Sequence, residues 1–569
     1  MIHHYCTRNC QFYERRCRRP SGYVVCDPFF VFVDILSTPE NAREVAEQRL
    51  LDDLVRALGG NRLPLRDPCM AGTRLDILHR IATETKRTDG HNVIWIRGSP
   101  GVGKSALAAS ILTQLEDQGR RVIPFRFDHT QSTTITTEAL WRVVACDFAR
   151  WYPSLRRKLA QGISELSSFN IDHLFEILIE KPLFTLSHDP REGLPVIMID
   201  ALDECGGLRH DSSGRKDYVA LLRTLRRWTR EDHLKKFKLI ITSRPEGQIA
   251  QTFPDSISTH VNIPSGRDVK PGDSAFSDIC AFLNDRFDSR KMEAAWVKEA
   301  LDYLVPSAAG MFIWATTAAD FLLVDPETRL DILKRGDDSG GLDNLHSLYL
   351  TVVTKSFEHA IEREIKAIIS VIGATIFAKQ PLDDTVLMRL PGVEDLDTLK
   401  FIKNGLMSVI DSGSTLRFHH RSFEDFLLHP SFSQRLGELS AIQDRGLHER
   451  QLAILCLNTI VSSELHFNMC NLKSSNIKNV DIPAKSAISP LISYSSQFWA
   501  DHLVQTHEET FTKAVEFVMY EKLLFWIEVM SILGKAHEVS AILKRALEWP
   551  RLAVCPGIIS CNATLRLTG

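Results

Sequence analysis

The sequence predicts an α/β fold with a parallel sheet in the first half of the chain, followed by helical segments. Three observations predict it. Short apolar runs alternate with helical patterns between about residues 65 and 265, a glycine-rich loop separates the first of these runs from its helix, and the strand signal fades after residue 265. A chain of 569 residues is also too long for one hydrophobic core, so we expect several domains.

The elements follow from local patterns. Amphipathic helices are predicted at 41–58 and 73–86, and a Gly- and Pro-rich segment separates them. Buried strands are predicted at Val93–Ile96, Val122–Phe127, Leu194–Ile199 and Phe237–Ile241. Further helices are expected from about Lys104 and at 137–151 and 218–229. Strands that alternate with helices form a parallel sheet covered on both faces, although Pro124 weakens the second strand.

Composition and pattern divide the chain into five predicted parts. They are a partly irregular N-terminal region with one helix (1–64), the α/β core (65–265), a small helical domain (266–335), a mainly helical domain with one short strand near Leu416–His419 (344–440), and a C-terminal helical region (441–569). The turn-rich stretch Gly336–Gly341 is predicted to be the linker before the fourth part.

The charge balance excludes some function classes. The 68 basic and 71 acidic side chains give a net charge of −3, which argues against bulk attraction to nucleic acid or membranes. No apolar run reaches the ~18 residues that span a bilayer, and no signal peptide is recognisable, so we expect a cytoplasmic protein without a membrane partner. Its twelve cysteines are then expected to be reduced. Four of them, Cys6, Cys10, Cys17 and Cys26, lack the paired spacing of a zinc knuckle and are interpreted as free thiols.

One motif predicts phosphate binding. It is Gly98-Ser99-Pro100-Gly101-Val102-Gly103-Lys104-Ser105, which matches G-x-x-x-x-G-K-[ST] in full between a strand and a helix that continues through Ala106. Glycines let backbone N–H groups close around phosphates, and the helix directs its positive end at them. Lys104 is expected to reach the β- and γ-phosphates and Ser105 to bind Mg²⁺. The motif therefore predicts a P-loop site for a nucleoside triphosphate.

A second, acidic element follows the third predicted strand. Asp200 ends this strand and is expected to hold the Mg²⁺ shell. Asp203 and Glu204 come directly after it, and a carboxylate there would orient an attacking water. The alternative is an exposed acidic turn or a helix N-cap. We favour the functional interpretation, because ligands bind at the carboxyl ends of α/β strands.

A third element ends the fourth predicted strand, at Arg244. Its guanidinium would sense or stabilise the γ-phosphate, and a surface arginine in a turn is the equally weighted alternative. Pro245 disfavours the helical conformation for Arg244 and keeps that residue extended.

With these elements placed, the chain resembles the NACHT family of signal-transducing NTPases, of the STAND class. Asp200-Ala201-Leu202-Asp203-Glu204 carries the resemblance. Other signatures look like the fungal vegetative (heterokaryon) incompatibility proteins, namely Cys69–Arg74, Thr242–Glu246 and Ala309–Ala315. The resemblance covers roughly residues 65–550. Relatives often continue into WD40 repeats, which this sequence lacks.

The resemblance also implies a winged-helix domain within residues 344–440. The segment Phe418–Leu427 looks like the winged-helix segment of such proteins, and the matching family histidine, which contacts the β-phosphate of a bound diphosphate, is His420. A histidine that merely packs in the wing is the alternative. Ser422, followed by Asp425, is predicted to cap the next helix.

The family implies a switch that is closed with ADP or GDP, opens on exchange for ATP or GTP, and is reset by slow hydrolysis catalysed with Lys104, Asp203, Glu204 and Arg244. A homo-oligomer on activation and an unidentified protein effector are the implied partners, and the sequence leaves ATP against GTP open. A non-hydrolysing interaction scaffold is a second hypothesis. A nucleic-acid-stimulated NTPase is a third, disfavoured because acidic residues interrupt its basic stretch around Arg223–Lys238.

Overall fold

The computed structural model describes residues 39–58, 62–87, 89–131, 135–165, 170–186, 195–205, 212–245, 247–270, 272–335, 342–413, 415–430, 435–472, 487–506 and 511–549. The chain divides into two compact units, Met1–Gly60 with Trp141–Ser187, and Asn61–Leu140 with His188–Gly569. The N-terminal cysteine cluster and the predicted linker Gly336–Gly341 lie outside the described residues.

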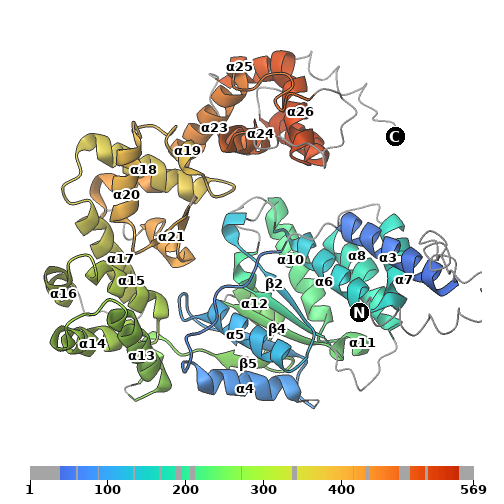
Figure 1. Ribbon diagram of the computed structural model, residues 1–569, viewed down its shortest axis with the longest axis horizontal. Coiled ribbons are helices and arrows are strands. Elements are labelled where there is room, and N and C mark those ends of the chain that lie inside the picture. The colour runs from blue at the N-terminus through green and yellow to red at the C-terminus, as the bar shows by residue number, and fades with distance from the viewer. Residues whose placement is uncertain are drawn as a thin grey trace, which may run out of the picture. The chain divides into compact units, whose positions relative to one another are not determined.

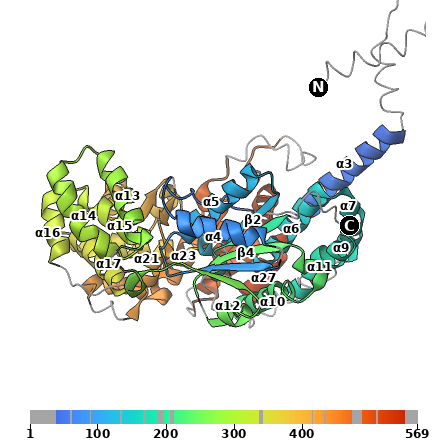
Figure 2. The same cartoon turned by 90° about the horizontal axis from the view of Figure 1, so that it is seen from below.

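The second unit contains a parallel five-stranded sheet in the order β2-β3-β4-β1-β5. The strands are β1 (Val93–Arg97), β2 (Val122–Arg126), β3 (Val196–Asp200), β4 (Lys238–Ser243) and β5 (Thr259–Asn262). Helices α4 (Leu75–Lys86) and α5 (Lys104–Asp117) cover one face, and α10 (Ser212–Arg227) and α12 (Gly247–Thr252) cover the other (Figures 1 and 2). The predicted α/β fold class is confirmed.

The four predicted strands are confirmed, and β5 is an additional strand. Only Val261 of its four residues is fully buried, so the edge strand has no apolar run that a pattern would detect. Strand β2 forms the opposite edge of the sheet. An edge strand has neighbours on one side only, which explains why Pro124 is tolerated there.

The first unit is helical. It contains α3 (Pro39–Leu58), α7 (Pro153–Glu165), α8 (Ile171–Phe175), a π-helical turn (Glu176–Glu180), α9 (Lys181–Phe184) and the larger part of α6 (Thr137–Trp151). Helix α3 packs against α7, and Glu47 pairs there with Arg156 and Arg157. The helices predicted at 41–58 and 137–151 are therefore confirmed.

Helices dominate the second unit after the sheet. A first group consists of α13 (Ser274–Asp288), α14 (Ala294–Ala308), α15 (Phe312–Leu322) and α16 (Pro326–Lys334). A second group consists of α17 (Leu342–Ser356), α18 (Glu362–Phe377), α19 (Asp384–Leu387), α20 (Leu396–Gly405), the antiparallel strands β6 (Ile410–Ser412) and β7 (Leu416–Phe418), and α21 (Arg421–Leu427). Helices followed by two short strands fit a winged-helix arrangement, and we call β6, β7 and α21 together the wing. The sequence predicted one short strand here, and the second, β6, is too short to give a pattern.

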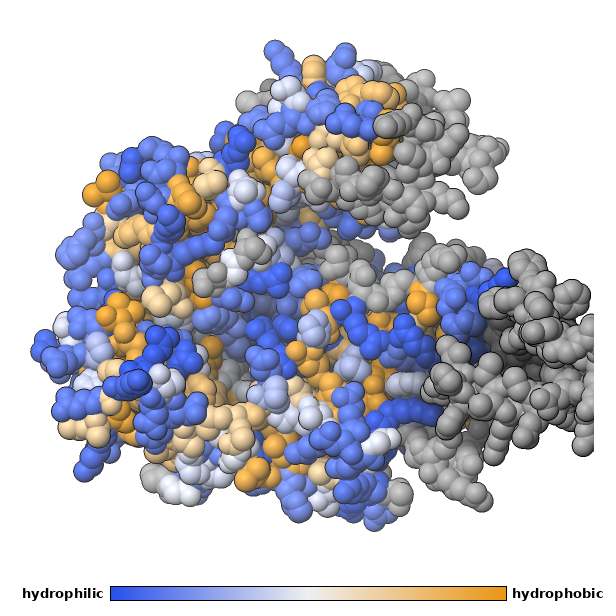
Figure 3. Space-filling view, viewed as in Figure 1, coloured by the Kyte–Doolittle hydropathy of each residue, from blue (hydrophilic) through white to orange (hydrophobic). Residues whose placement is uncertain are grey.

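The last group consists of α23 (Arg445–Val461), α24 (Pro490–Leu503), α25 (Thr512–Phe517), α26 (Leu523–Ile532) and α27 (Val539–Glu548). Its core contains Trp499 and Trp526, whose rings meet edge to face. The molecular face in Figure 3 is mostly hydrophilic, with hydrophobic residues scattered among the polar ones. None of the described helices is both long and apolar enough to cross a bilayer. The five predicted domain boundaries stay predictions.

Candidate functional site

The glycine-rich loop lies between β1 and α5, at the carboxyl edge of the sheet. Gly101 and Gly103 have φ angles of 75° and 92°, which side chains with a Cβ rarely adopt. Helix α5 begins at Lys104, so Ser105 and Ala106 lie in the first turn, where free N–H groups attract anions. The Lys104 ammonium donates hydrogen bonds to the carbonyls of Gly98 and Ser99, both at 2.9 Å. Burial lowers the pKa of Lys104.

Two segments outside the motif hold this loop in place. The backbone N–H of Ile313, on α15, donates to the Gly101 carbonyl at 3.0 Å. The buried guanidinium of Arg74 donates to the carbonyls of Val102 at 3.0 Å and Gly310 at 3.1 Å. Arg74 precedes α4 and lies over the ring of Phe312. The loop is therefore fixed to the first helical group as well as to the sheet.

Asp200 lies fully buried at the end of β3. Its Oδ1 accepts hydrogen bonds from Ser105 Oγ at 3.1 Å and from Thr242 Oγ1 at 2.6 Å. Its Oδ2 is also buried and has no hydrogen-bond partner among the described residues. A hydroxyl and a carboxylate with a free oxygen suit Mg²⁺, which prefers oxygen ligands. Burial raises the pKa of Asp200, and a bound cation would favour the ionised form. These residues fit the predicted metal.

Asp203 and Arg244 form an ion pair beside the loop. Arg244 Nε lies 3.2 Å from Asp203 Oδ2, and the Arg244 backbone N–H donates to Asp203 Oδ1 at 3.1 Å. The same guanidinium reaches Asp425 on α21 through Nη1 at 2.7 Å. Arg421, also on α21, donates to the Asp203 carbonyl at 3.2 Å. Arg244 is therefore not a free surface arginine, because it connects the end of β4 with the wing.

Glu204 faces a histidine that follows β2. Its Oε2 accepts from the backbone N–H of His129 at 3.3 Å and lies 3.1 Å from His129 Nδ1. The opposite ring nitrogen, Nε2, lies 2.7 Å from Glu424 Oε2 on α21. Burial opposes a charge on His129, but the two carboxylates outweigh it and raise the pKa of His129 to about 10. Despite its burial, Glu204 has a lowered pKa because His129 donates to it.

His420 directly precedes α21 and caps it. Its Nδ1 accepts from the backbone N–H of Ser422 at 3.0 Å, so the N-cap is His420 and the predicted cap at Ser422 is wrong. The Ser422 hydroxyl lies 2.8 Å from the same nitrogen and 2.7 Å from the Tyr349 hydroxyl. An accepting Nδ1 leaves the proton on Nε2. Burial and the Lys104 ammonium lower the pKa of His420 to about 3, which keeps the ring neutral.

The structure brings the predicted site residues to one edge of the sheet. Lys104 interacts electrostatically with four of them, namely Asp203, Arg244, Asp200 and Glu204. It also interacts electrostatically with His420. The sequence did not indicate Arg74, His129, Arg421, Glu424 or Asp425 as site residues. His129 was detectable in principle, since it follows the carboxyl end of β2 as Asp203 follows that of β3.

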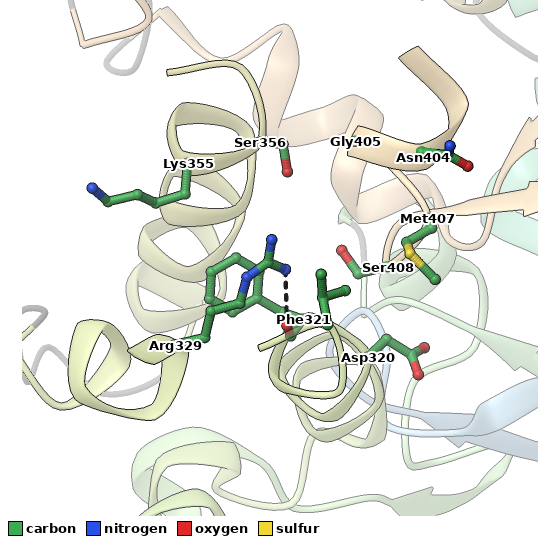
Figure 4. Close-up of a pocket in the computed structure, with 10 residues that line it drawn as sticks. Asp320, Phe321, Arg329, Lys355, Ser356, Asn404, Gly405, Met407 and Ser408 are labelled. Atoms are coloured by element: carbon green, nitrogen blue, oxygen red, sulfur yellow. Dashed lines mark hydrogen bonds between the residues drawn. The ribbon is translucent and has the colours of Figure 1, made fainter. Parts of the chain in front are cut away.

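A separate pocket lies between the first and second helical groups (Figure 4). It is small, at about 110 Å³, and Asp320, Arg329, Lys355 and Asn404 contribute to its lining. Arg329 donates to the Phe321 carbonyl at 2.9 Å and covers the Phe321 ring. Pockets for small molecules typically measure roughly 300 to 1,000 Å³, so a nucleotide would not fit there. None of the predicted site residues lines it.

Comparison with known proteins supports the family resemblance. Residues 72–244 match the family model of the N-terminal region of nephrocystin 3, a span that runs from the segment before the P-loop to Arg244. The vegetative incompatibility protein HET-E-1 of Podospora anserina is 24% identical over 487 residues. The match covers 79% of this chain and 34% of that protein, so the chain spans about a third of its relative's length.

These matches support a P-loop NTPase of the NACHT/STAND type that is similar to HET-E-1. Solved structures give weaker likenesses. A signal transduction ATPase with numerous domains and a tetratricopeptide repeat sensor, from Pyrococcus horikoshii, is 17% identical with a TM-score of 0.35, covering 86% of this chain and 64% of that one. A Walker-type ATPase of Pyrococcus abyssi is 12% identical with a TM-score of 0.30, covering 64% and 98%. The likeness to NACHT proteins rests on the sequence matches and the motifs.

We predict that Gly101→Ala weakens both the fold and the loop. A Cβ at Gly101 would lie 1.8 Å from Ile313 Cγ2, and the positive φ adds strain. Overpacking and strain together cost about 2 to 5 kcal/mol. Gly119→Ala is the matched control, because Gly119 has a φ of 72° but open space around it. Thermal unfolding should show a larger loss for Gly101→Ala, and equal losses would contradict the clash.

We also predict a pH-dependent contribution of His129 to stability. Its folded-state pKa is raised to about 10 from 6.5, so the contribution is complete below about pH 6.5 and lost as the pH rises towards about 10. The free-energy difference between wild type and His129→Gln, a few kcal/mol at low pH, should therefore shrink over that range. Urea unfolding across the range measures it. A difference that stays constant with pH would show that no buried imidazolium is present.

Proposed function

We propose that this protein is a nucleotide-controlled signalling switch that binds ATP or GTP with Mg²⁺, hydrolyses it slowly, and self-associates in its open form. One observation carries the proposal. Helix α21 of the wing segment makes ion pairs with residues that follow β2 and β4 and a hydrogen bond to the backbone carbonyl of a residue that follows β3, at the edge where the phosphates would lie. Occupancy of the P-loop can then be read by another part of the chain.

The binding step uses the loop and its first helical turn. Backbone N–H groups between Gly98 and Ala106 surround the β-phosphate, and Lys104 exchanges its carbonyl partners for phosphate oxygens. Ser105 and Asp200 would hold Mg²⁺, an assignment that the unpaired Oδ2 of Asp200 supports. The bound ion would supply positive charge beside the phosphates. Nothing in this set reads a base, so both ATP and GTP are proposed as ligands.

In the hydrolysis step, Glu204 orients the attacking water and Arg244 stabilises the γ-phosphate. Asp203 positions Arg244 through its ion pair. Both Glu204 and Arg244 are already engaged by other side chains in this structure, which supports slow turnover. A side chain that must first leave its present partner raises the activation barrier of hydrolysis by the free energy of that separation.

In the switching step, His420 contacts the β-phosphate of a bound diphosphate. Its neutral ring keeps a proton on Nε2 that can be donated to a phosphate oxygen, and Ser422 and Tyr349 fix this tautomer. A γ-phosphate would compete for the same edge as Asp425 and Glu424. Exchange for triphosphate thus weakens the hold on α21 and opens the protein.

The biological setting is proposed by relationship to HET-E-1. We infer a role in fungal self/non-self recognition or an immunity-like response, with homo-oligomerisation on opening and an effector protein as the downstream partner. The scaffold alternative makes a different prediction for turnover, which the following variants distinguish.

The test compares binding with turnover. Lys104→Ala should weaken binding of fluorescent mant-ATP or mant-GTP by roughly 10- to 100-fold, because charge-assisted bonds to phosphate are lost. Glu204→Gln should keep binding and reduce turnover by roughly 100-fold or more. Lys298→Ala, an exposed lysine on α14, is the control. Binding that survives Lys104→Ala contradicts the site. Equal turnover of wild type, Asp203→Asn and Glu204→Gln supports the scaffold instead.

A further inference from the structure

His129 lies between two carboxylates from distant parts of the chain. Nδ1 faces Glu204 at 3.1 Å, and Nε2 faces Glu424 at 2.7 Å. The side chain of His129 is 10% exposed, and that of Glu424 is 5% exposed. Glu204 follows β3, whereas Glu424 is on α21. One imidazole ring therefore joins the water-orienting carboxylate of the NTPase core to the wing.

Proton counting determines the state of this ring. A neutral imidazole has one N–H group and one lone pair, so one of its two nitrogens would face a carboxylate oxygen without a hydrogen. With both acids ionised, both contacts are hydrogen bonds only if His129 is an imidazolium. The bridge then consists of one positive charge between two negative charges. Each carboxylate stabilises the positive charge on His129, with which the other carboxylate is also paired.

The surrounding charges leave this bridge intact. Asp128 is adjacent to His129 but pairs with Arg126 at 3.0 Å. On α21, Arg421 and Asp425 are directed to Asp203 and Arg244. Arg66, Arg421 and His420 act on Glu204 only through longer-range electrostatics. The second oxygen of Glu424, Oε1, is buried without a hydrogen-bond partner among the described residues. Among the described residues, His129 is therefore the one hydrogen-bond partner of the Glu424 side chain.

A metal ion is a poorer explanation of this cluster. Asp128, His129 and Glu204 offer ligand atoms within 4.8 Å of one another. A metal ligand must present a lone pair, however, and the imidazolium form of His129 has none on either ring nitrogen. Arg126 already neutralises Asp128. The geometry favours a protonated imidazole, not a metal ion, between the carboxylates of Glu204 and Glu424.

We propose that His129 is a positioning residue that couples the docking of α21 to the availability of Glu204, with Glu424 as its partner on the wing. The proposal deepens the proposed function and rests on it. While α21 is docked, Glu204 accepts a hydrogen bond from His129 and is a weak base towards water. When α21 leaves, His129 loses Glu424, gives up its extra proton to solvent more readily, and releases the Glu204 carboxylate to orient water.

The same bridge also stabilises the docked position of α21. Separating it would leave Glu424 without its partner and His129 with one carboxylate in place of two. Removing one member of a buried ion pair is strongly destabilising. His129 therefore holds the closed form together and suppresses hydrolysis in it, so hydrolysis and opening are coupled through one side chain.

The experiment measures release of preloaded mant-ADP, with mant-GDP in parallel, from wild type, His129→Gln, Glu424→Gln and the double variant. Each single variant should speed release about 10-fold, within the usual range of coupling between sites. The double variant should release no faster than the faster single variant, because both changes break one bridge. Glu327→Gln, an exposed acid on α16, is the control.

Turnover and pH separate this role from a merely structural one. Glu424→Gln should also raise turnover, because it frees Glu204 without touching it. Release from wild type should accelerate as the pH rises towards about 10, whereas release from Glu424→Gln should be fast throughout. If Glu424→Gln lowers the unfolding temperature more than the control does, Glu424→Asp keeps the charge but shortens its reach and should give the same faster release.

The outcomes distinguish this inference from the proposed function. Unchanged release in both single variants, or single effects that multiply in the double variant, would overturn the bridge while leaving the switch in place. Wild-type protein that binds neither labelled nucleotide would instead overturn the proposed function on which the bridge rests.

Discussion

The organisation of this protein depends on one electrostatic constraint. Three carboxylates occur within five residues at the end of the buried strand β3, and the side chain of the first, Asp200, is fully buried. Charges taken out of water must be paired or bound to a cation, at a cost of several kcal/mol each if they are not. Each of the three carboxylates therefore needs a partner. The partners come from different parts of the chain, and this need brings the site together.

Each carboxylate interacts with side chains from different elements. Asp200 accepts hydrogen bonds from hydroxyl groups on α5 and β4, and its free oxygen would be available to the proposed Mg²⁺. Asp203 takes Arg244 from the end of β4. Glu204 takes His129 from the end of β2. The two cationic partners are then each shared with an acid on α21, so the wing is bound by the same charges that neutralise the core. A change in charge at the phosphates cannot leave these pairs unaffected.

The sequence predicted the parts of this arrangement that are local. The P-loop, the buried strand before Asp200 and the strand before Arg244 each form a continuous pattern, so their elements and the edge where they meet could be inferred. Strand β5 could not, because an edge strand with one buried residue has no periodic signal. His420 was identified by family resemblance, and its capping role was not, since Nδ1 replaces the expected Ser422 hydroxyl.

The contacts across the chain were beyond pattern analysis. The local signal for His129 is its place after the carboxyl end of β2, which says nothing of its partners, and Glu424 and Asp425 look like ordinary acids on a short helix. Their roles arise only when folding sets α21 against the ends of β2 and β4. Arg74 is a similar case, because its buried guanidinium is explained by carbonyls of Val102 and Gly310, which are distant in sequence.

The central claim is that a wing helix closes over a nucleotide held at the P-loop. Its most direct test is to denature the purified protein, release what it carries, and identify it by ion-exchange chromatography. The account predicts close to one nucleoside diphosphate per chain from wild type and none from Lys104→Ala. Wild-type protein that carries no nucleotide, or that carries predominantly triphosphate, would contradict it.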